Sequence, residues 1–63
     1  MVRDFKGSMY GIRTYHLKGY DADNDVYLDG IYDIHEDGKI EGPYGIVRND
    51  NEINSVRNIV NKL

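Results

Sequence analysis

The sequence contains no cysteine and no tryptophan, and it has only one proline, Pro43, and one phenylalanine, Phe5. Without cysteine there is no disulfide to stabilise a small fold, and the two histidines do not belong to a cluster of metal ligands. A chain of 63 residues hides only about 60% of its unfolded surface when it folds. Small folds without disulfides or metals are commonly stabilised by oligomerisation, so we expect a homodimer.

Long apolar runs are also missing. None approaches the roughly 20 residues that a membrane span requires, and the first residues lack the apolar core of a signal peptide. We therefore expect a soluble, intracellular protein with no membrane partner, built as a single small interaction domain over residues 1–63.

The charges are distributed unevenly along the chain, although the net charge is only −3. Residues 21–41 carry eight acids and one base, which gives −7, whereas the other residues carry three acids and seven bases, which gives +4. A segment with this charge repels nucleic acid and attracts basic surfaces, so we do not expect nucleic acid as a partner. The alternative is that these acids only keep a small sheet soluble and protect its edges.

Two segments have the composition of β-strands. Residues 26–35 alternate between apolar and polar, with Ile31 as the misfit, and one face of the predicted strand carries Val26, Leu28, Tyr32 and Ile34. Residues 9–17 are aromatic and β-branched, but their alternation slips. A β-bulge near Gly11 or Arg13, or burial of both faces, would explain the slip.

The flanking segments are shorter or less regular. Residues 1–8 show no clear periodicity, and Phe5 is their expected anchor. Asp37-Gly38 favours a hairpin turn that leads into a short third strand around Ile40, with residues 46–47 as a possible extension.

The C-terminal segment predicts an amphipathic helix. Asn49 is a suitable N-cap, and Glu52 stands three residues later, at the capping-box spacing. One stripe of the helix is apolar: Ile53, Val56, Ile59, Val60 and Leu63. We expect an α+β fold, a three-stranded antiparallel β-sheet with one C-terminal amphipathic α-helix, homodimeric, with the stripe partly covered by the second subunit.

The only proline lies in the run Lys39-Ile40-Glu41-Gly42-Pro43-Tyr44-Gly45. Proline fixes its own φ and pushes the preceding residue toward extended geometry, so Glu41 and Tyr44 should be held in a defined corner. Such a corner can present a carboxylate and an aromatic ring to a partner. The alternative is an ordinary β-turn that joins a strand to the helix, with Tyr44 half buried.

Catalytic and metal-binding motifs are not found. Asp21, Asp23 and Asp25 resemble the start of an EF-hand loop, but Val26 stands at its glycine position and Tyr32 at that of the bidentate glutamate. There is no phosphate-binding loop, dinucleotide fingerprint or nucleophile paired with a base. We expect no enzyme activity, cofactor, metal or small-molecule substrate, because six tyrosines among acids are more typical of a binding surface.

The chain resembles the very small uracil-DNA glycosylase inhibitors of some Bacillus phages, which are acidic dimeric proteins that imitate DNA. The family motif of an apolar aromatic, Glu, two residues, Tyr and Gly is matched by Ile40-Glu41-Gly42-Pro43-Tyr44-Gly45. The family's Tyr-acid-apolar-His pattern is matched by Tyr32-Asp33-Ile34-His35. Met1-Val2, Asp4-Phe5 and Ser8 also agree, but Ile40 stands where the family has phenylalanine.

The resemblance implies an inhibitor of host uracil-DNA glycosylase in the cytoplasm of the bacterial host. Carboxylates would occupy phosphate positions of the enzyme, while an apolar groove would sequester its DNA-probing side chain. The candidate partner-binding residues are Ile40, Glu41, Tyr44, Asp33, Tyr32, Ile53 and Val56. The alternatives are a small acidic protein-interaction domain and a DNA mimic directed at another DNA-acting enzyme.

Overall fold

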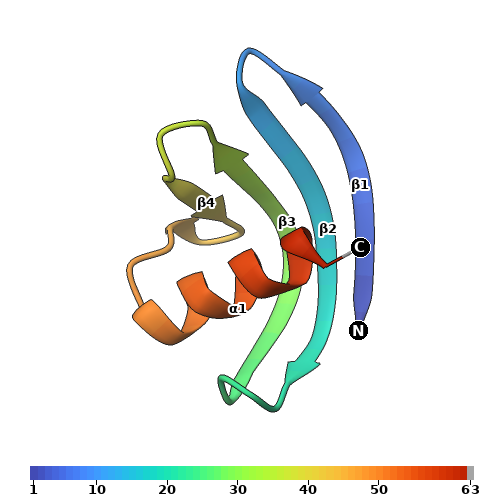
Figure 1. Cartoon of the computed structure of the whole chain (residues 1–63), viewed down its shortest axis with the longest axis vertical. Helices are drawn as coiled ribbons and strands as arrows, with labels where there is room; N and C mark the ends of the chain where they lie inside the picture. The colour runs from blue at the N-terminus through green and yellow to red at the C-terminus, as the bar shows by residue number, and fades with distance from the viewer. Residues whose placement is uncertain (63) are drawn as a thin grey trace.

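The structure is a computed structural model that describes residues 1–62, and it consists of a β-sheet followed by one helix (Figure 1). The elements are β1 (Val2–Met9), β2 (Ile12–Asp21), β3 (Val26–His35), β4 (Ile40–Gly42), β5 (Gly45–Ile46) and α1 (Asp50–Asn61). The strands form one antiparallel sheet in the order in which they occur along the chain. The α+β class and the C-terminal helix are confirmed, but the sheet has five strands rather than the expected three.

The additional first strand arises because residues 9–17 are not continuous. Met9 ends β1 and pairs with Ile12 of β2, and the two residues between them form a tight hairpin turn. Tyr10 has φ of 55° and Gly11 has φ of 74°, as a two-residue type I′ turn requires. Tyr10 therefore lies in a turn and not in a strand. The slip between Ile12 and Tyr15 arises because Ile12 lies on one face of β2, whereas Tyr15 and Leu17 are buried on the other.

The register does shift, but in β1 and not near Gly11 or Arg13. The shift lies between Phe5, which pairs with Tyr15, and Gly7, which pairs with Thr14. Phe5 was expected to anchor this segment, and its ring lies 5.2 Å from that of Tyr15 between centroids. It nevertheless remains 54% exposed, so it covers the margin of the core.

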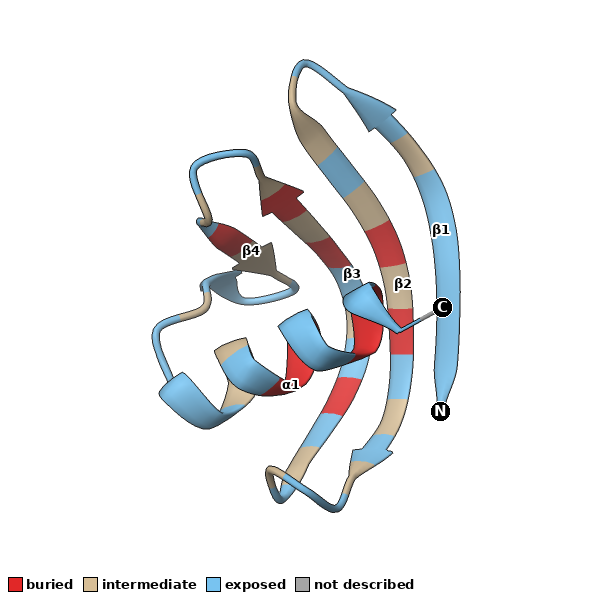
Figure 2. Ribbon diagram, in the orientation of Figure 1, coloured by how far each residue is buried: buried red, intermediate tan, exposed pale blue. Residues whose placement is uncertain are grey.

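The hydrophobic core lies between α1 and one face of the sheet, which we call the covered face (Figure 2). The alternation predicted for residues 26–35 is confirmed, since Leu28, Tyr32 and Ile34 are buried. The sheet and helix together contribute the buried apolar side chains Tyr15, Leu17, Leu28, Tyr32, Ile34, Ile40, Val56, Ile59 and Val60. By contrast, β1 contains no buried residue.

The helix begins and packs as its sequence predicts. The Asn49 side chain accepts a hydrogen bond from the backbone N–H of Glu52 at 3.0 Å. Val56, Ile59 and Val60 are buried against the chain's own sheet. The stripe therefore does not need a second subunit for its burial, contrary to our expectation, and Leu63 lies outside the described residues. Within residues 1–62, no helix is long and apolar enough to cross a membrane.

Arg3 ties the first strand to the last turn of the helix. Its Nη1 atom donates to the carbonyl oxygen of Ile59 at 3.3 Å and to that of Lys62. Carbonyls at a helix C-terminus have no partner within the helix, and they carry the negative end of its dipole. A guanidinium from β1 therefore compensates for the absence of basic residues in the last turn of α1.

The turn Gly42-Pro43-Tyr44-Gly45, which we call the proline corner, packs on the covered face. The Pro43 ring lies directly against Gly30 of β3, where φ is 147° and an added Cβ would meet the ring. A Cβ on Gly42 would approach the Tyr32 ring at 2.9 Å. Two glycines thus let the corner approach the sheet closely, and this contact fixes its position.

Candidate functional site

Among residues 1–62, no element packs on the face of the sheet opposite α1, and we call this the open face. Cross-strand partners share a face, so the register assigns its members. They are Val2, Asp4 and Met9 of β1; Ile12, Thr14, His16, Lys18 and Tyr20 of β2; Tyr27, Asp29, Ile31, Asp33 and His35 of β3; Glu41 of β4; and Ile46 of β5.

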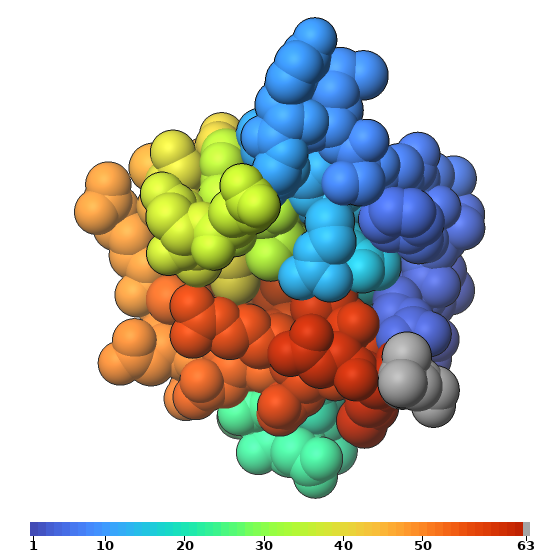
Figure 3. Space-filling model, turned by 45° about the horizontal axis from the view of Figure 1, so that its top comes forward, coloured from blue at the N-terminus to red at the C-terminus, as the bar shows by residue number. Residues whose placement is uncertain are grey.

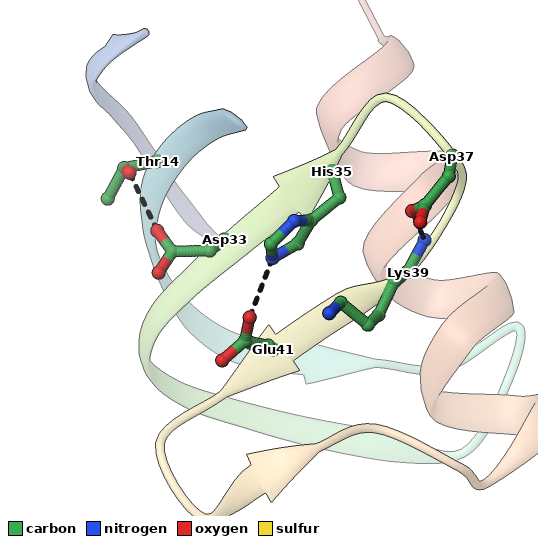
Figure 4. Close-up of polar contacts among 6 residues, drawn as sticks. All are labelled: Thr14, Asp33, His35, Asp37, Lys39 and Glu41. Atoms are coloured by element: carbon green, nitrogen blue, oxygen red, sulfur yellow. Dashed lines mark hydrogen bonds and ion pairs between the residues drawn. The ribbon is translucent and has the colours of Figure 1, made fainter. Parts of the chain in front are cut away.

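Two carboxylates of the open face lie opposite each other, because Asp33 pairs with Glu41 across β3 and β4. Like charges in this position are destabilising unless other groups compensate. The Thr14 hydroxyl donates to Asp33 at 2.6 Å, and the His35 Nε2 atom lies 2.7 Å from Glu41 (Figure 4). Both carboxylates are therefore held in fixed orientations.

The open face also carries apolar side chains that α1 does not cover. Ile31, at the middle of β3, is 47% exposed, and the aromatic pair Tyr20 and Tyr27 is 57% and 61% exposed. Val2, Met9 and Ile46 on the flanking strands are exposed too. The open face therefore combines exposed apolar side chains with charged and polar ones, and protein–protein interfaces likewise combine an apolar centre with a polar rim.

The residues predicted from the sequence to bind a partner fall into two groups. Ile40, Tyr32 and Val56 have exposures of 2%, 3% and 0%. Their side chains belong to the core, where they support the surface instead of forming it, and Ile53 packs at the margin of the same core. Glu41, Asp33 and Tyr44 have polar or aromatic groups at the surface.

Tyr44 is 100% exposed at the tip of the proline corner, so the alternative in which it is half buried is wrong. Beside it lies a cavity of about 220 Å³, to which Pro43, Ile46 and Val47 contribute apolar walls. Glu52 of α1 lines the same cavity. For comparison, a cavity of about 150 Å³ accommodates benzene, so this hollow can admit one aliphatic side chain.

Burial affects the tyrosine that supports the corner. The pKa of Tyr32 is raised, first because the ring is buried and second because the Glu52 carboxylate lies nearby. The Tyr32 hydroxyl donates to that carboxylate at 3.5 Å, the upper limit for a hydrogen bond. Tyr32 therefore joins β3, the corner and the first turn of α1 in its neutral form.

The β2–β3 turn carries three acids, but it does not form a cation site of the EF-hand type. The Asp21 carboxylate accepts hydrogen bonds from the Asn24 side chain at 2.9 Å and the Asp23 backbone N–H at 3.1 Å. The first of these bonds is the main reason that the pKa of Asp21 is lowered. Asp25 accepts the Tyr20 hydroxyl at 2.6 Å, which raises the pKa of that tyrosine. These acids thus order the turn.

A larger hollow of about 460 Å³ lies beside the tip of the β1–β2 hairpin, which projects from the rest of the molecule (Figure 3). Met9 and Ile12 contribute apolar groups to its lining, and Thr14 and Asp33 contribute polar groups. Gly7 has no side chain to fill the space. The hollow is part of the open face.

Sequence reasoning did not identify Thr14 or His35 as partners of the two carboxylates. Only the strand register shows these contacts. Thr14 stands directly opposite Asp33 across β2 and β3, and His35 lies two residues after Asp33 on the same face of β3. In the described part of the chain, no three His, Cys, Asp or Glu side chains are placed to hold a metal ion.

No protein-family model matches the sequence, and neither a curated protein nor a solved structure matches it.

Proposed function

We propose that this chain is a noncatalytic inhibitor of uracil-DNA glycosylase that binds the enzyme in place of DNA. The observation that carries the proposal is Tyr44, a fully exposed ring on a corner that Pro43 anchors against Gly30. An exposed ring contributes little to the stability of its own chain, but it supplies a large contact area with few rotamers to freeze. Its position suits an interface.

The chemistry around Tyr44 supports a target that normally binds DNA. The cavity beside the ring would receive the apolar side chain with which the glycosylase probes DNA. Glu41 is held by His35 and offers carboxylate oxygens to donors that otherwise contact phosphate. The charge of −7 over residues 21–41 would accelerate encounter with a basic DNA-binding groove.

We also propose that the inhibitor is a homodimer, since its core is small. The alternative functions are a small acidic protein-interaction domain and a DNA mimic of a different target. Both predict an exposed binding face, but neither predicts inhibition of uracil excision.

The test is a titration of uracil excision by purified glycosylase with the parent chain and its variants. Tyr44→Ala and Glu41→Ala should each weaken inhibition by roughly 2 kcal/mol or more, as hot-spot residues do. Asp23→Ala, which removes one exposed charge from a turn, should cost under about 1 kcal/mol.

Tyr10→Ala is the matched control for the aromatic ring. Tyr10 is 93% exposed at the β1–β2 turn, and its truncation should leave inhibition unchanged. Absence of binding at both low and moderate salt would refute the glycosylase target. Binding without loss of excision would refute DNA mimicry, and equal losses from Tyr10→Ala and Tyr44→Ala would remove the corner from the interface.

A further inference from the structure

One row of residues connects the larger hollow with the proline corner across the whole sheet. Along this row the register pairs Gly7 with Thr14, Thr14 with Asp33, Asp33 with Glu41, and Glu41 with Ile46. The first three line the hollow beside the β1–β2 hairpin, and Ile46 lines the cavity at the corner. Neighbouring strands lie about 4.8 Å apart, so the row spans roughly 19 Å. One partner surface can therefore reach the corner and the hollow together.

We propose that the hollow receives an arginine side chain from the DNA-binding surface of the glycosylase, with its guanidinium against Asp33. The proposal rests on the proposed function, which supplies the partner, and it adds a second contact to the one at the corner. Proteins hold DNA phosphates largely through arginine and lysine side chains. A guanidinium can donate two parallel hydrogen bonds to a carboxylate, as it does to a phosphate. An arginine that has lost its phosphate would therefore find a matching acceptor at Asp33.

The hollow exists because the row begins with residues that have little or no side chain. Gly7 has φ of 140°, and no atom lies within 4 Å of the position that a Cβ would take. Beside it, Thr14 is short and directs its hydroxyl to Asp33, to which it donates at 2.6 Å (Figure 4). The space over β1 and β2 therefore ends at a carboxylate.

The lining of the hollow matches the two ends of an arginine side chain. Met9 and Ile12 contribute apolar groups, on which the apolar stem of an arginine can lie. Asp33 contributes a carboxylate for the charged head. Tyr10 also borders the hollow, but its side chain is 93% exposed and covers little of it, so truncation of Tyr10 leaves the site intact.

Asp33 is the aspartate of the open face that has no base beside it. The other two are compensated, because Lys6 pairs with Asp4 at 2.8 Å and Lys18 stands opposite Asp29 in the register. The cross-strand partner of Asp33 on β4 is another acid, and among residues 1–62 Asp33 forms no ion pair. A cation is therefore the group that this position of the sheet lacks.

Partial burial strengthens the attraction of this position for a cation. Asp33 is half-buried, and the Glu41 carboxylate opposite it adds a second negative charge. Water screens charges less at a half-buried position than on an open surface. Lys6 also lines the hollow, but its ammonium group is already paired with Asp4. The charge of the hollow is thus complementary to a guanidinium.

A side chain of a bound protein suits the hollow better than a free small molecule does. The volume of about 460 Å³ falls within the range of ligand pockets, but the hollow is open to solvent beside the projecting hairpin (Figure 3). A free ligand would lose its translational freedom in return for one charged contact. An arginine on a protein that is already bound at the corner is present at a high effective concentration.

The first experiment measures inhibition of uracil excision by Asp33→Asn. Asparagine keeps the shape of the residue and can still accept the Thr14 hydroxyl, so circular dichroism should be unchanged. Loss of the charge should weaken inhibition at least about tenfold, whereas Asp29→Asn, on the same strand and face, should weaken it less than about threefold. Equal effects of the two variants would overturn the proposal. A parent chain that does not inhibit would instead refute the proposed function, and this contact with it.

Substitutions in the enzyme identify the partner residue. Arginines of the DNA-binding surface of the glycosylase are changed to alanine one at a time, and each variant is titrated with the parent chain and with Asp33→Asn. One substitution should weaken inhibition by the parent at least about fivefold but leave inhibition by Asp33→Asn nearly unchanged, because the acceptor of that arginine is already absent. Independent losses for every arginine would overturn the contact.

A pair of substitutions tests whether the hollow itself is occupied. Thr14→Leu and Thr14→Val both remove the hydroxyl that holds Asp33, but only leucine adds length that fills the hollow. Thr14→Leu should therefore weaken inhibition at least about tenfold more than Thr14→Val does. Equal inhibition by the two variants, with unchanged circular dichroism, would show that no side chain enters the hollow and would overturn the proposal.

Discussion

The two faces of the sheet are built from the same strands but depend on different partners. On the covered face, Leu17 and Leu28 are completely buried beneath α1. On the open face, the equivalent alternate positions hold charged residues and half-exposed apolar ones such as Ile31. The comparison indicates that the covered face stabilises the chain, whereas the open face contributes little to its core. Substitutions on the two faces should therefore have separable effects.

The largest expected effect is that of Leu28→Ala on the covered face. Removing a fully buried leucine should lower the free energy of unfolding by about 2–5 kcal/mol, because lost transfer energy is added to the energy of a cavity. Ile31→Ala, on the same strand but on the open face, should change the stability of the monomer by less than about 1 kcal/mol. Urea titration at low protein concentration measures both. Similar losses of unfolding free energy in the Leu28→Ala and Ile31→Ala variants would contradict the distinction between the covered and open faces.

Gly30→Ala should destabilise the chain by about 1–3 kcal/mol, because the new methyl group meets the Pro43 ring and displaces the corner. Part of any loss comes from the positive φ of 147°. Gly7→Ala separates the two causes, since its φ is 140° and no atom lies within 4 Å of the added Cβ. Thermal unfolding should show the larger loss at Gly30, and the opposite order would contradict the packing of the corner.

Arg3→Ala should lower stability by about 1 kcal/mol, since the carbonyls of Ile59 and Lys62 lose a charged donor near the end of the helix. Relative to the parent chain, the substitution should accelerate hydrogen exchange of the backbone amides more in the last turn of α1 than in its first turn. Lys6→Ala is the control, because Lys6 also lies on the edge strand but pairs with Asp4 and not with the helix. Uniform acceleration along α1 would argue against a local cap.

The smallest effect concerns alkaline pH. The pKa of Tyr32 is raised in the folded chain, so the unfolded chain releases this proton first as the pH rises. The contribution of Tyr32 to the free energy of unfolding is fully present below about pH 10 and declines above it. Tyr32→Phe should therefore lose less stability than the parent between neutral and strongly alkaline pH. Parallel curves for the two proteins in urea titrations would contradict this linkage.

The sequence was sufficient to predict the elements whose burial produces a periodic pattern. The alternation of β3 and the stripe of α1 both reflect one buried face. β1 was missed as a separate strand because none of its side chains is buried, so no period of two could appear. Tyr10 in a left-handed conformation also concealed the turn, since tyrosine is not among the residues that favour it.

The candidate site was predictable only in part. The sequence identified Glu41 and Tyr44 beside the only proline, and both have exposed groups. The sequence pattern could not distinguish an apolar residue at an interface from one in the core. Ile40 and Tyr32 were therefore predicted to lie at the binding surface, but both are buried in the core. Only the pairing of β2, β3 and β4 brings Thr14 and His35 to the two carboxylates.

The order of the strands has a consequence for how the chain reaches this structure. Every strand pairs with its neighbour in the sequence, so the sheet can grow hairpin by hairpin with short loops to close. The contact of Arg3 with Lys62 instead joins residues 59 positions apart. Proteins rich in local contacts fold quickly, and we expect the sheet to form early. Docking of the helix end onto β1 would then be the last and most readily reversed step.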